Sequence, residues 1–566
     1  MNSHNTQNGK TTQGINVLVF HICTNIEAVL VTIANLGKII WLSDSFIYLR
    51  VMLSRYYHTL KYLRTRQIFY QLYYKFRALF RKFTGYRPAF NHYKKGELLV
   101  FTEWIKAHDS YHQNTFTFLN LPVTFEKINW DYPLNGKLWT YNLNYFDFLN
   151  QSAINKEEGL SLIRNFIPQL PQLKNANEPY PISLRGINWI KFICKHKLQD
   201  KDIDQSLYSQ YRILQQHIEY HLLGNHLLEN AFSLYIGGLY FNDDQLRSKG
   251  FKLISEELKE QTLKDGGHFE LSPMYHQIIL TRLLDCCSFA TNKIELETLR
   301  NYATKMLAWL RTMTLRNGDI PLLNDSAKNI APPSAEIFAY AQRLGISSGA
   351  ATLSDSGYRK WDIDGAELIM DVGKVGPDYI PGHAHADIFS FVLYDGGPVI
   401  TDTGISTYEK NPRREEERGT ACHNTVCVNG QNQVDTWGGF RVGKRCKVVI
   451  DLEQKDEIAA HHNGYAGTIH SRNWKKINDI EFLISDELKG KDINGIFHLH
   501  FHPSVKVVLE NNVLYAANWK ISFDKVKTVS LQKYAHAEDF NILGEGTRAK
   551  IEFESDITTS VTRVKL

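Results

Sequence analysis

The spacing of apolar residues changes along the chain and divides it into a helical part and a β part. From about residue 150 to 345, apolar residues recur every three or four positions, which predicts one helix after another. After about Asp355 they alternate with polar residues in short runs such as Lys447–Asp451 and Ile496–Phe501. Turn-forming dipeptides separate these runs. The pattern therefore predicts a helical domain followed by an antiparallel β domain, for which a sandwich is the expected form.

Two helix starts are marked by their local sequence. Gly224 is expected to end one helix, and Asn225 to cap the next, which runs to about Leu239. Ser272 followed by Pro273 is typical of an N-cap and a first-turn proline. This places Tyr275 and His276 in the first turn of a helix. The free amides and the dipole at that end favour anionic character, including a phenolate.

Residues 52–83 carry apolar side chains at helical spacing and predict one or two basic amphipathic helices. Arg and Lys recur from Arg50 to Lys95, where acidic residues are nearly absent. Two interpretations stay open. In the first, the helices bind an anionic membrane surface or polymer. In the second, they pack on the main body and their charged residues form a solvated face.

The first 51 residues form an N-terminal extension. Two apolar stretches, 15–23 and 26–36, are interrupted by polar residues, so neither a spanning helix nor a signal peptide is predicted. Met52 is an alternative start, because a more regular amphipathic pattern begins there.

Composition adds few constraints. A chain of 566 residues exceeds what one hydrophobic core usually serves, so two or three domains are expected. The net charge of +5 suits an acidic partner without requiring one. Seven cysteines without a CxxC pair indicate neither a disulfide framework nor a zinc finger. No nucleic-acid recognition module is visible, so no nucleic-acid partner is expected.

The densest group of candidate site residues lies in the β part. His383 and His385 are two positions apart in the segment Pro381–Asp387, so extended chain places both on one face. Asp402 and His423 follow. Two imidazoles and a carboxylate form a donor set that zinc accepts. Because the chain holds 22 histidines, a chance cluster is the competing interpretation.

Several segments in order resemble the heparinase II/III-like polysaccharide lyases, over roughly residues 55 to 560. They are Trp139–Phe148, Tyr180–Trp189, Asn225–Asn230, Gly266–His276, Pro381–Asp387 and Ala421–Val426. The resemblance implies an α+β multidomain chain in which an incomplete α/α toroid at 131–350 is followed by a β-sandwich at 351–566. The basic aromatic region at 52–130 and the extension at 1–51 precede them.

The resemblance also implies a reaction, β-elimination at a 4-linked uronic acid. Asn225 matches the residue that neutralises the uronate carboxylate, with His226 or His383 as a second donor. Tyr275 matches the catalytic tyrosine, which takes one proton and delivers the other. His383 matches the alternative base.

Other matches concern metal and substrate. His385, Asp402 and His423 match the ligands of members that hold a structural zinc ion, while other members use such residues as a hydrogen-bonded cluster. Four residues are candidates for the sugar cleft, with buried structural roles as the alternative; they are Arg185, Trp189, Glu229 and His276.

Departures from the family pattern weaken any transfer of specificity. Ile279 stands where related sequences often have an arginine, one turn after Tyr275. The lack of a convincing signal peptide departs from secreted degradative members. The basic aromatic N-terminal helical region resembles members that accompany bacterial capsule or exopolysaccharide biosynthesis. The expected compartment is therefore the bacterial envelope or periplasm, with peripheral envelope association, and the cytoplasm is the alternative.

Three other functions are weighed against the lyase. A non-catalytic polysaccharide-binding component of an assembly system would keep the cleft and lose the chemistry. A glycoside hydrolase needs two facing carboxylates, for which Glu229, Glu270 and Asp325 are candidates. A metallohydrolase is disfavoured because Ile388 stands where its last histidine would be.

Overall fold

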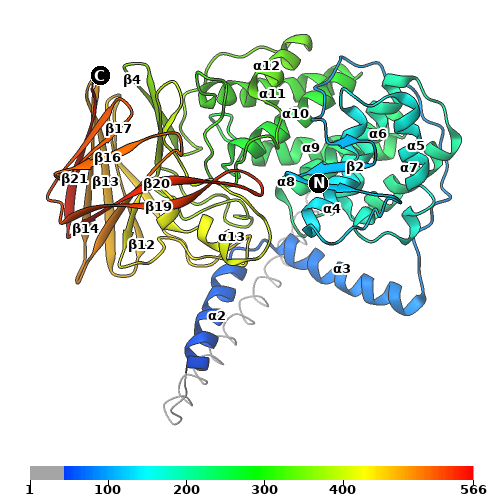
Figure 1. Cartoon of the computed structure of the whole chain (residues 1–566). Coiled ribbons are helices and arrows are strands. Elements are labelled where there is room, and N and C mark those ends of the chain that lie inside the picture. The colour runs from blue at the N-terminus through cyan, green and yellow to red at the C-terminus, as the bar shows by residue number, and fades with distance from the viewer. Residues whose placement is uncertain (1–43, 565–566) are drawn as a thin grey trace, which may run out of the picture. The chain divides into compact units, whose positions relative to one another are not determined.

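The computed structural model describes residues 44–564 (Figure 1). Predictions about residues 1–43 lie outside the described residues. The chain divides at His58/Thr59 into two units. The predicted basic helices are α2 (Asp44–Leu60) and α3 (Thr65–Thr84). Within the described part of the chain, no helix combines the length and apolar character needed to cross a bilayer.

Nine helices of the second unit form the predicted helical region. Their apolar faces share one core that includes Trp139, Trp189 and Phe232. Aspartate or asparagine caps start several of them; Asp200, for example, accepts the amides of Asp202 and Ile203. The helices are α4 (Gly136–Tyr145), α5 (Lys156–Phe166), α6 (Pro179–His196), α7 (Lys201–Gln216), α8 (Gly224–Tyr240), α9 (Asp244–Gln261), α10 (Pro273–Phe289), α11 (Lys293–Met313) and α12 (Ser334–Arg343).

The two predicted helix starts have different outcomes. Ser272 is confirmed as the cap of α10, because its hydroxyl oxygen accepts the amide of Tyr275 at 3.2 Å. The prediction for α8 was wrong in detail. The preceding helix ends earlier, at Gln216, and α8 begins at Gly224 after Leu223, which has φ of 66°. Asn225 therefore lies inside the first turn, and its side chain is directed to a distant partner instead of its own helix.

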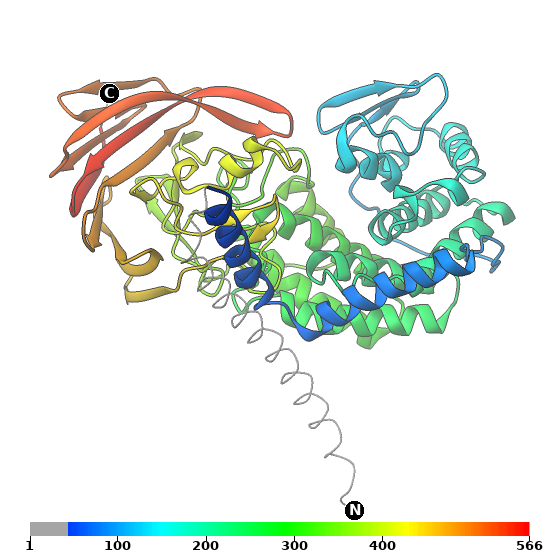
Figure 2. The same cartoon turned by 90° about the horizontal axis from the view of Figure 1, so that it is seen from below.

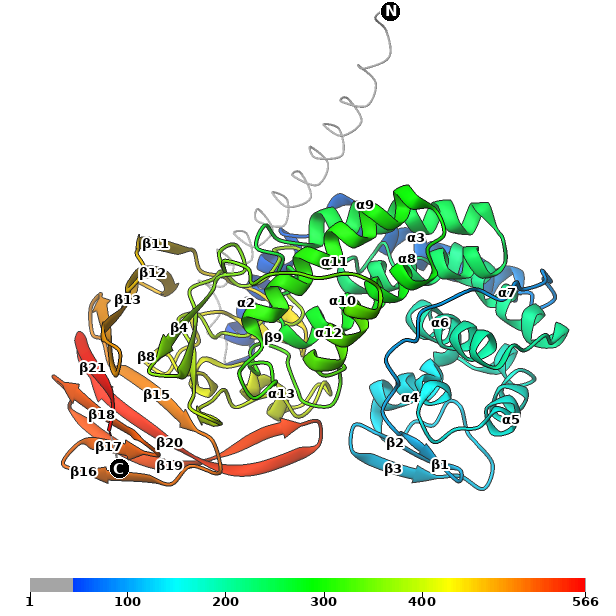
Figure 3. The ribbon, with the colours of Figure 1, turned by 90° about the horizontal axis from the view of Figure 1, so that it is seen from above.

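The β region consists of two antiparallel eight-stranded sheets that pack face to face (Figure 3). Apolar side chains of both inner faces form one core, with Trp474 and Trp519 from one sheet and Phe497 from the other. The first sheet holds β4 (Tyr358–Ile363), β5 (Ala366–Asp371), β6 (Phe391–Tyr394), β7 (Pro398–Ile400), β8 (Val426–Val428), β15 (Gly495–Phe501), β19 (Thr528–Asp539) and β20 (Ile542–Phe553).

The second sheet shows the alternation that predicted it. In β13, every second residue from Thr468 to Trp474 is buried, and Trp474 lies opposite Ile484 of β14. This sheet holds β11 (Val448–Glu453), β12 (Glu457–Tyr465), β13 (Thr468–Asn478), β14 (Glu481–Lys489), β16 (Val507–Glu510), β17 (Val513–Ala516), β18 (Trp519–Asp524) and β21 (Asp556–Arg563).

Smaller elements complete the described fold. They are β1 (Tyr111–His112), β2 (Thr115–Phe118), β3 (Leu121–Thr124), β9 (Thr436–Trp437), β10 (Arg441–Val442) and α13 (Pro412–Glu417). A third apolar cluster joins Trp309 and Met313 of α11 to Ile369 and Val392 of the first sheet. The helical and β regions therefore share packed side chains at their junction, which fixes the loops that carry the candidate site.

Candidate functional site

The first turn of α8 holds Asn225 against a buried glutamate. Both the backbone amide and the side-chain Nδ2 of Asn225 donate to Glu270, at 3.0 and 2.8 Å. Gly224 permits this approach, because a Cβ there would lie 2.5 Å from Glu270 Oε1 and its φ is 57°. The orientation of the Asn225 amide is therefore set before any ligand binds.

Tyr275 and His383 lie against each other beside Asn225. Their rings stack with centroids 3.8 Å apart and planes 29° apart. His383 Nε2 lies 3.4 Å from Asn225 Nδ2. The structure thus brings together three predicted residues from α8, α10 and the loop before β6.

Asp325 fixes His383 from the opposite side. Its carboxylate accepts from His383 Nδ1 at 2.9 Å, from His385 Nε2 at 2.8 Å, and from both terminal nitrogens of Arg414 at 2.6 and 2.7 Å. Burial alone would raise the pKa of Asp325, but Arg414 and the two histidines outweigh it and hold that pKa well below its usual range. Because the charged carboxylate only accepts, His383 donates to it from Nδ1, and its Nε2 faces Asn225.

The surroundings of Tyr275 disfavour a phenolate, contrary to the expectation from its helix position. Burial raises the pKa of Tyr275 strongly, and the carboxylates of Asp325 and Glu270 disfavour a phenolate further. The Tyr408 hydroxyl donates to the Tyr275 oxygen at 3.4 Å, which opposes the rise only partly. Desolvation and two nearby negative charges thus outweigh the helix dipole.

His226 is directed away from this group toward Glu219. Its Nδ1 lies 3.2 Å from Glu219 Oε1, and a third of its side chain is exposed. Burial lowers the pKa of His226, but the Glu219 carboxylate outweighs that and raises it overall. The ring of His226 also packs against the ring of Tyr180, with the two ring centroids 4.5 Å apart. A role for His226 as second donor stays a prediction.

Two of the predicted cleft residues lie inside the helical core. Arg185 is fully buried and donates to the Gln210 side chain and to the carbonyls of Asn144 and Ala176. Burial lowers the pKa of Arg185 to about 9. Trp189 is equally buried, against two phenylalanine rings. The prediction that they line the sugar cleft was wrong, since neither has a surface to offer a polymer.

The other two predicted cleft residues, His276 and Glu229, are also fully buried. His276 donates from Nε2 to the Met306 carbonyl at 2.9 Å, and burial lowers its pKa to about 3. Neither oxygen of Glu229 has a hydrogen-bond partner, although Arg282 Nε lies 3.6 Å away. Burial raises the pKa of Glu229 to about 7. Neither side chain reaches a substrate, and Glu229 does not orient His226.

The predicted zinc ligands lie together in a buried network. His423 Nδ1 lies 2.7 Å from Asp402 Oδ2, and the rings of His385 and His423 are 5.3 Å apart. His385 Nδ1 and His423 Nε2 are buried without partners, so the donor chemistry suits an ion. However, within residues 44–564 no three His, Cys, Asp or Glu side chains are grouped so as to hold a metal ion. The zinc site stays a prediction.

Four site residues were not assigned these roles from the sequence. Glu270 and Asp325 were considered only as carboxylates of a hydrolase, and Arg414 and Tyr408 were not considered. Arg414 reaches Asp325 from α13, and its guanidinium lies over the Tyr408 ring at 4.9 Å. Glu270 belongs to the recognised segment before Tyr275, the one local signal that was available.

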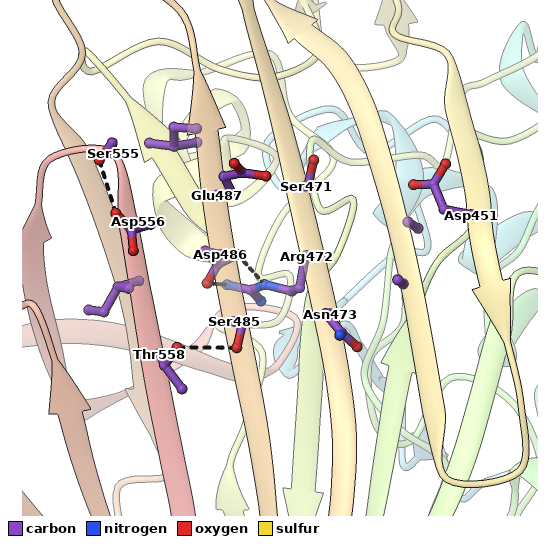
Figure 4. Close-up of a pocket in the computed structure, with 14 residues that line it drawn as sticks. Asp451, Ser471, Arg472, Asn473, Ser485, Asp486, Glu487, Ser555, Asp556 and Thr558 are labelled. Atoms are coloured by element: carbon purple, nitrogen blue, oxygen red, sulfur yellow. Dashed lines mark hydrogen bonds and ion pairs between the residues drawn. The ribbon is translucent and has the colours of Figure 1, made fainter.

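A separate hollow of about 500 Å³ lies on the second sheet (Figure 4). It is lined by residues of β11, β12, β13, β14 and β21 and contains none of the predicted site residues. Its guanidinium and a facing carboxylate, Arg472 and Asp486, are buried and bonded to each other. The candidate site therefore stays at the junction of the helical and β regions.

Comparison with protein families decides the relationship. The model described as Heparinase II/III N-terminus matches residues 182–339, and the model described as Heparinase II/III-like, C-terminal, matches residues 346–563. The chain belongs to the heparinase II/III-like family. The matched ranges hold Asn225, Tyr275 and His383, so the candidate site of this family member lies within them.

Curated relatives of this heparinase II/III-like chain are distant. A heparin-sulfate lyase of Bacteroides stercoris is 24% identical over 322 residues, which cover 50% of this chain and 46% of the relative. A heparin-sulfate lyase of Pedobacter heparinus is 25% identical over 306 residues, covering 47% and 44%. The chain spans about half the length of the curated relatives it matches.

Solved structures confirm the fold. A structure of heparinase III superposes with a TM-score of 0.61 at 18% identity, over 77% of this chain and 79% of that one. The heparan sulfate lyase HepC from Pedobacter heparinus gives 0.54 at 16% identity, over 80% and 82%. The predicted architecture, an incomplete α/α toroid followed by an antiparallel β-sandwich, is confirmed.

Proposed function

We propose that this protein is a polysaccharide lyase that cleaves an acidic, uronate-containing polysaccharide by β-elimination. The observation that carries the proposal is the stacked pair Tyr275 and His383, held beside the fixed amide of Asn225. The heparin-sulfate lyase relatives support the same reaction class. We further propose that it acts in the bacterial envelope, on a glycosaminoglycan or a chemically similar polymer.

Asn225 neutralises the uronate carboxylate. Removal of the C5 proton drives charge into that carboxylate, so preorganised donors stabilise the transition state. One N–H of the Asn225 amide is used by Glu270. The other faces His383 at the long distance of 3.4 Å, a contact that a substrate carboxylate oxygen can replace. Because Glu270 holds the amide in place, no reorganisation is needed when the substrate binds.

His383 takes the C5 proton and Tyr275 supplies a proton to the leaving oxygen. Asp325 holds the Nδ1 proton of His383, so the Nε2 lone pair is free to act as base. The C5–H electrons form the C4–C5 double bond, and the C4–O bond breaks. The departing oxygen takes its proton from the Tyr275 phenol, which burial keeps protonated. A dual role for Tyr275 would first require a phenolate, which this environment disfavours.

The carboxylates of this region do not favour hydrolysis. A glycoside hydrolase needs two carboxyl groups free to face the scissile bond. Asp325 is occupied by Arg414 and two histidines, and Glu270 by Asn225. Glu229 lies in the core without access to substrate. Elimination uses the groups that remain available.

Zinc, if bound, would be held by His385, Asp402 and His423. There it would supply a structural positive charge that joins the loops of the sandwich near the site. No step described above uses it.

The experiment is to incubate the full chain with heparan sulfate, hyaluronan, chondroitin and alginate and to record ultraviolet absorbance. An absorbance rise from the conjugated unsaturated uronate on any polymer is the expected result and names the substrate class. New reducing ends without that absorbance would instead indicate hydrolysis. Binding without either product would favour a non-catalytic component of polysaccharide assembly.

A further inference from the structure

The outer face of α3 exposes an unusual row of large apolar side chains. Six leucine and phenylalanine residues are between 58% and 90% exposed; they are Phe69, Leu72, Phe76, Leu79, Phe80 and Phe83. Steps of three and four residues place all six on one side of the helix. Contiguous apolar surface of this kind marks an interaction site more often than a solvated face.

The opposite side of α3 fixes the helix to the toroid. Gln67 is buried, and its Nε2 donates to the carbonyls of Leu222 and Tyr379 at 3.3 and 3.2 Å. Farther along, the hydroxyl of Tyr74 donates to the Ile218 carbonyl at 2.5 Å. Figure 2 shows the helix running along the outside of the helical region. The apolar row is therefore held outward by polar anchors on the other side.

Basic residues border the apolar row on both sides. Lys75 and Lys82 lie along one edge, and Arg66 and Arg77 along the other. Arg66 lies 3.9 Å from Glu257, and Arg77 donates to the Gln216 carbonyl, so the lysine edge supplies the cations that remain available to a ligand. No Asp or Glu occurs in α3, nor anywhere from Arg50 to Lys95. An apolar stripe between cationic margins is typical of helices that lie in the interface of a bilayer.

We propose that α3 binds the surface of an anionic phospholipid bilayer. The helix axis lies in the plane of the membrane, the apolar row enters the boundary between headgroups and acyl chains, and Lys75 and Lys82 contact the phosphates. The inference is independent of the proposed function, since it uses no residue of the candidate site.

Charge and apolar surface together select this occupant over two others. An acidic polysaccharide would pair with the cations but would leave the phenylalanines in water. A second copy of the chain would cover the phenylalanines but would bring two purely basic helices together, and like charges repel. An anionic bilayer satisfies both features.

The attachment of α3 also relates the membrane to the candidate site. Leu222 and Tyr379, the acceptors of Gln67, lie three and four residues before Asn225 and His383 respectively. A bilayer bound by α3 would therefore hold the loops of the site close to the membrane surface.

The test is flotation of the full chain with vesicles of phosphatidylglycerol and phosphatidylcholine, compared with phosphatidylcholine alone. We expect binding to the anionic vesicles and little to the neutral ones. Replacing Phe76 and Phe80 by serine should weaken binding roughly tenfold or more. The matched control is Ile294→Ser on α11, which removes an apolar side chain that is 75% exposed and should change nothing.

A second pair of variants tests the charges. Lys75→Gln with Lys82→Gln should weaken binding to anionic vesicles roughly tenfold. Lys252→Gln with Lys264→Gln removes two exposed charges elsewhere and should have no effect. Circular dichroism and thermal unfolding verify that every variant is folded.

Three results would overturn the proposal. They are the absence of vesicle binding, vesicle binding that the Phe76/Phe80 variant retains, and binding equal on both vesicle types. Dimers that dissociate in the Phe76/Phe80 variant, with no lipid binding, would assign the row to a second copy of the chain.

Discussion

Asp325 and Glu229 are both fully buried carboxylates, yet their surroundings are opposite. Asp325, at the junction of the helical and β regions, accepts four hydrogen bonds from Arg414, His383 and His385. Glu229, inside α8, accepts none, and Arg282 Nε lies 3.6 Å from its carboxylate. The pKa of Asp325 is lowered well below its usual range, and that of Glu229 is raised to about 7.

The difference shows that burial alone does not identify a site residue. Desolvation raises the pKa of both groups, and the partners decide the net direction. Asp325 receives its partners from segments far apart in the chain and passes their constraint to His383. Glu229 has no such connection to the candidate site.

The largest expected effect comes from removing the charge of Asp325. Asp325→Asn leaves the buried Arg414 guanidinium uncompensated, which should reduce the free energy of unfolding by about 3–5 kcal/mol. It also removes the acceptor that orients His383, so any lyase activity should be lost. Urea unfolding and the uronate assay measure the two effects.

The matched substitution Glu229→Gln should change the free energy of unfolding near pH 6 by only about 1 kcal/mol or less, because no hydrogen bond is lost. Equal destabilisation by the two substitutions would remove the distinction between the two carboxylates.

The pH dependence of stability should have opposite sign for the two groups. The folded pKa of Asp325 is lowered below its unfolded value, so its stabilisation is present above that unfolded value, about 4, and is lost as the pH falls through the folded pKa. The pKa of Glu229 rises from 4.5 to about 7 on folding. Its stabilising contribution is present below pH 4.5 and is lost as the pH rises through about 7.

In the unmodified chain the free energy of unfolding should therefore decrease by up to about 3 kcal/mol between pH 5 and 8 because of Glu229. Glu229→Gln should abolish this decrease. Thermal unfolding at several pH values measures this. An unchanged pH profile in Glu229→Gln would contradict the raised pKa.

A smaller effect is expected at a third buried carboxylate, Asp402. His423→Ala removes its hydrogen-bond partner and should cost about 1–3 kcal/mol. If the zinc prediction holds, bound zinc measured by mass spectrometry should fall together with the unfolding temperature. Unchanged metal content in this variant would contradict the zinc site. The loss of stability would then be due to the broken hydrogen bond alone.

The sequence predicted the helices, the strands and three residues of the candidate site, but it did not predict the side chains that hold those three residues in place. Alternation predicted the strands, and Ser272 predicted the start of α10, because both are local signals. Asn225, Tyr275 and His383 were predicted through sequence motifs. In contrast, Asp325 meets Arg414 across 89 positions, and no local pattern encodes that contact.

The wrong predictions share a physical cause. Helical periodicity identifies an apolar face, but α6 is buried on almost every side from Pro181 to Cys194. Arg185 and Trp189 therefore belong to the core, although an arginine and a tryptophan also suit a sugar cleft. One turn along α8 separates Asn225, directed to the site, from Glu229, enclosed by the toroid.

The most direct test of the central claim is the rate of unsaturated uronate formation by Tyr275→Phe, compared with the unmodified chain. We expect kcat/KM to fall about 100-fold or more, since the proton donor is lost, with polymer binding and unfolding temperature nearly unchanged. Tyr515→Phe, at a partly exposed tyrosine of β17, should keep full activity. A Tyr275→Phe variant that retains most of its activity would contradict the account.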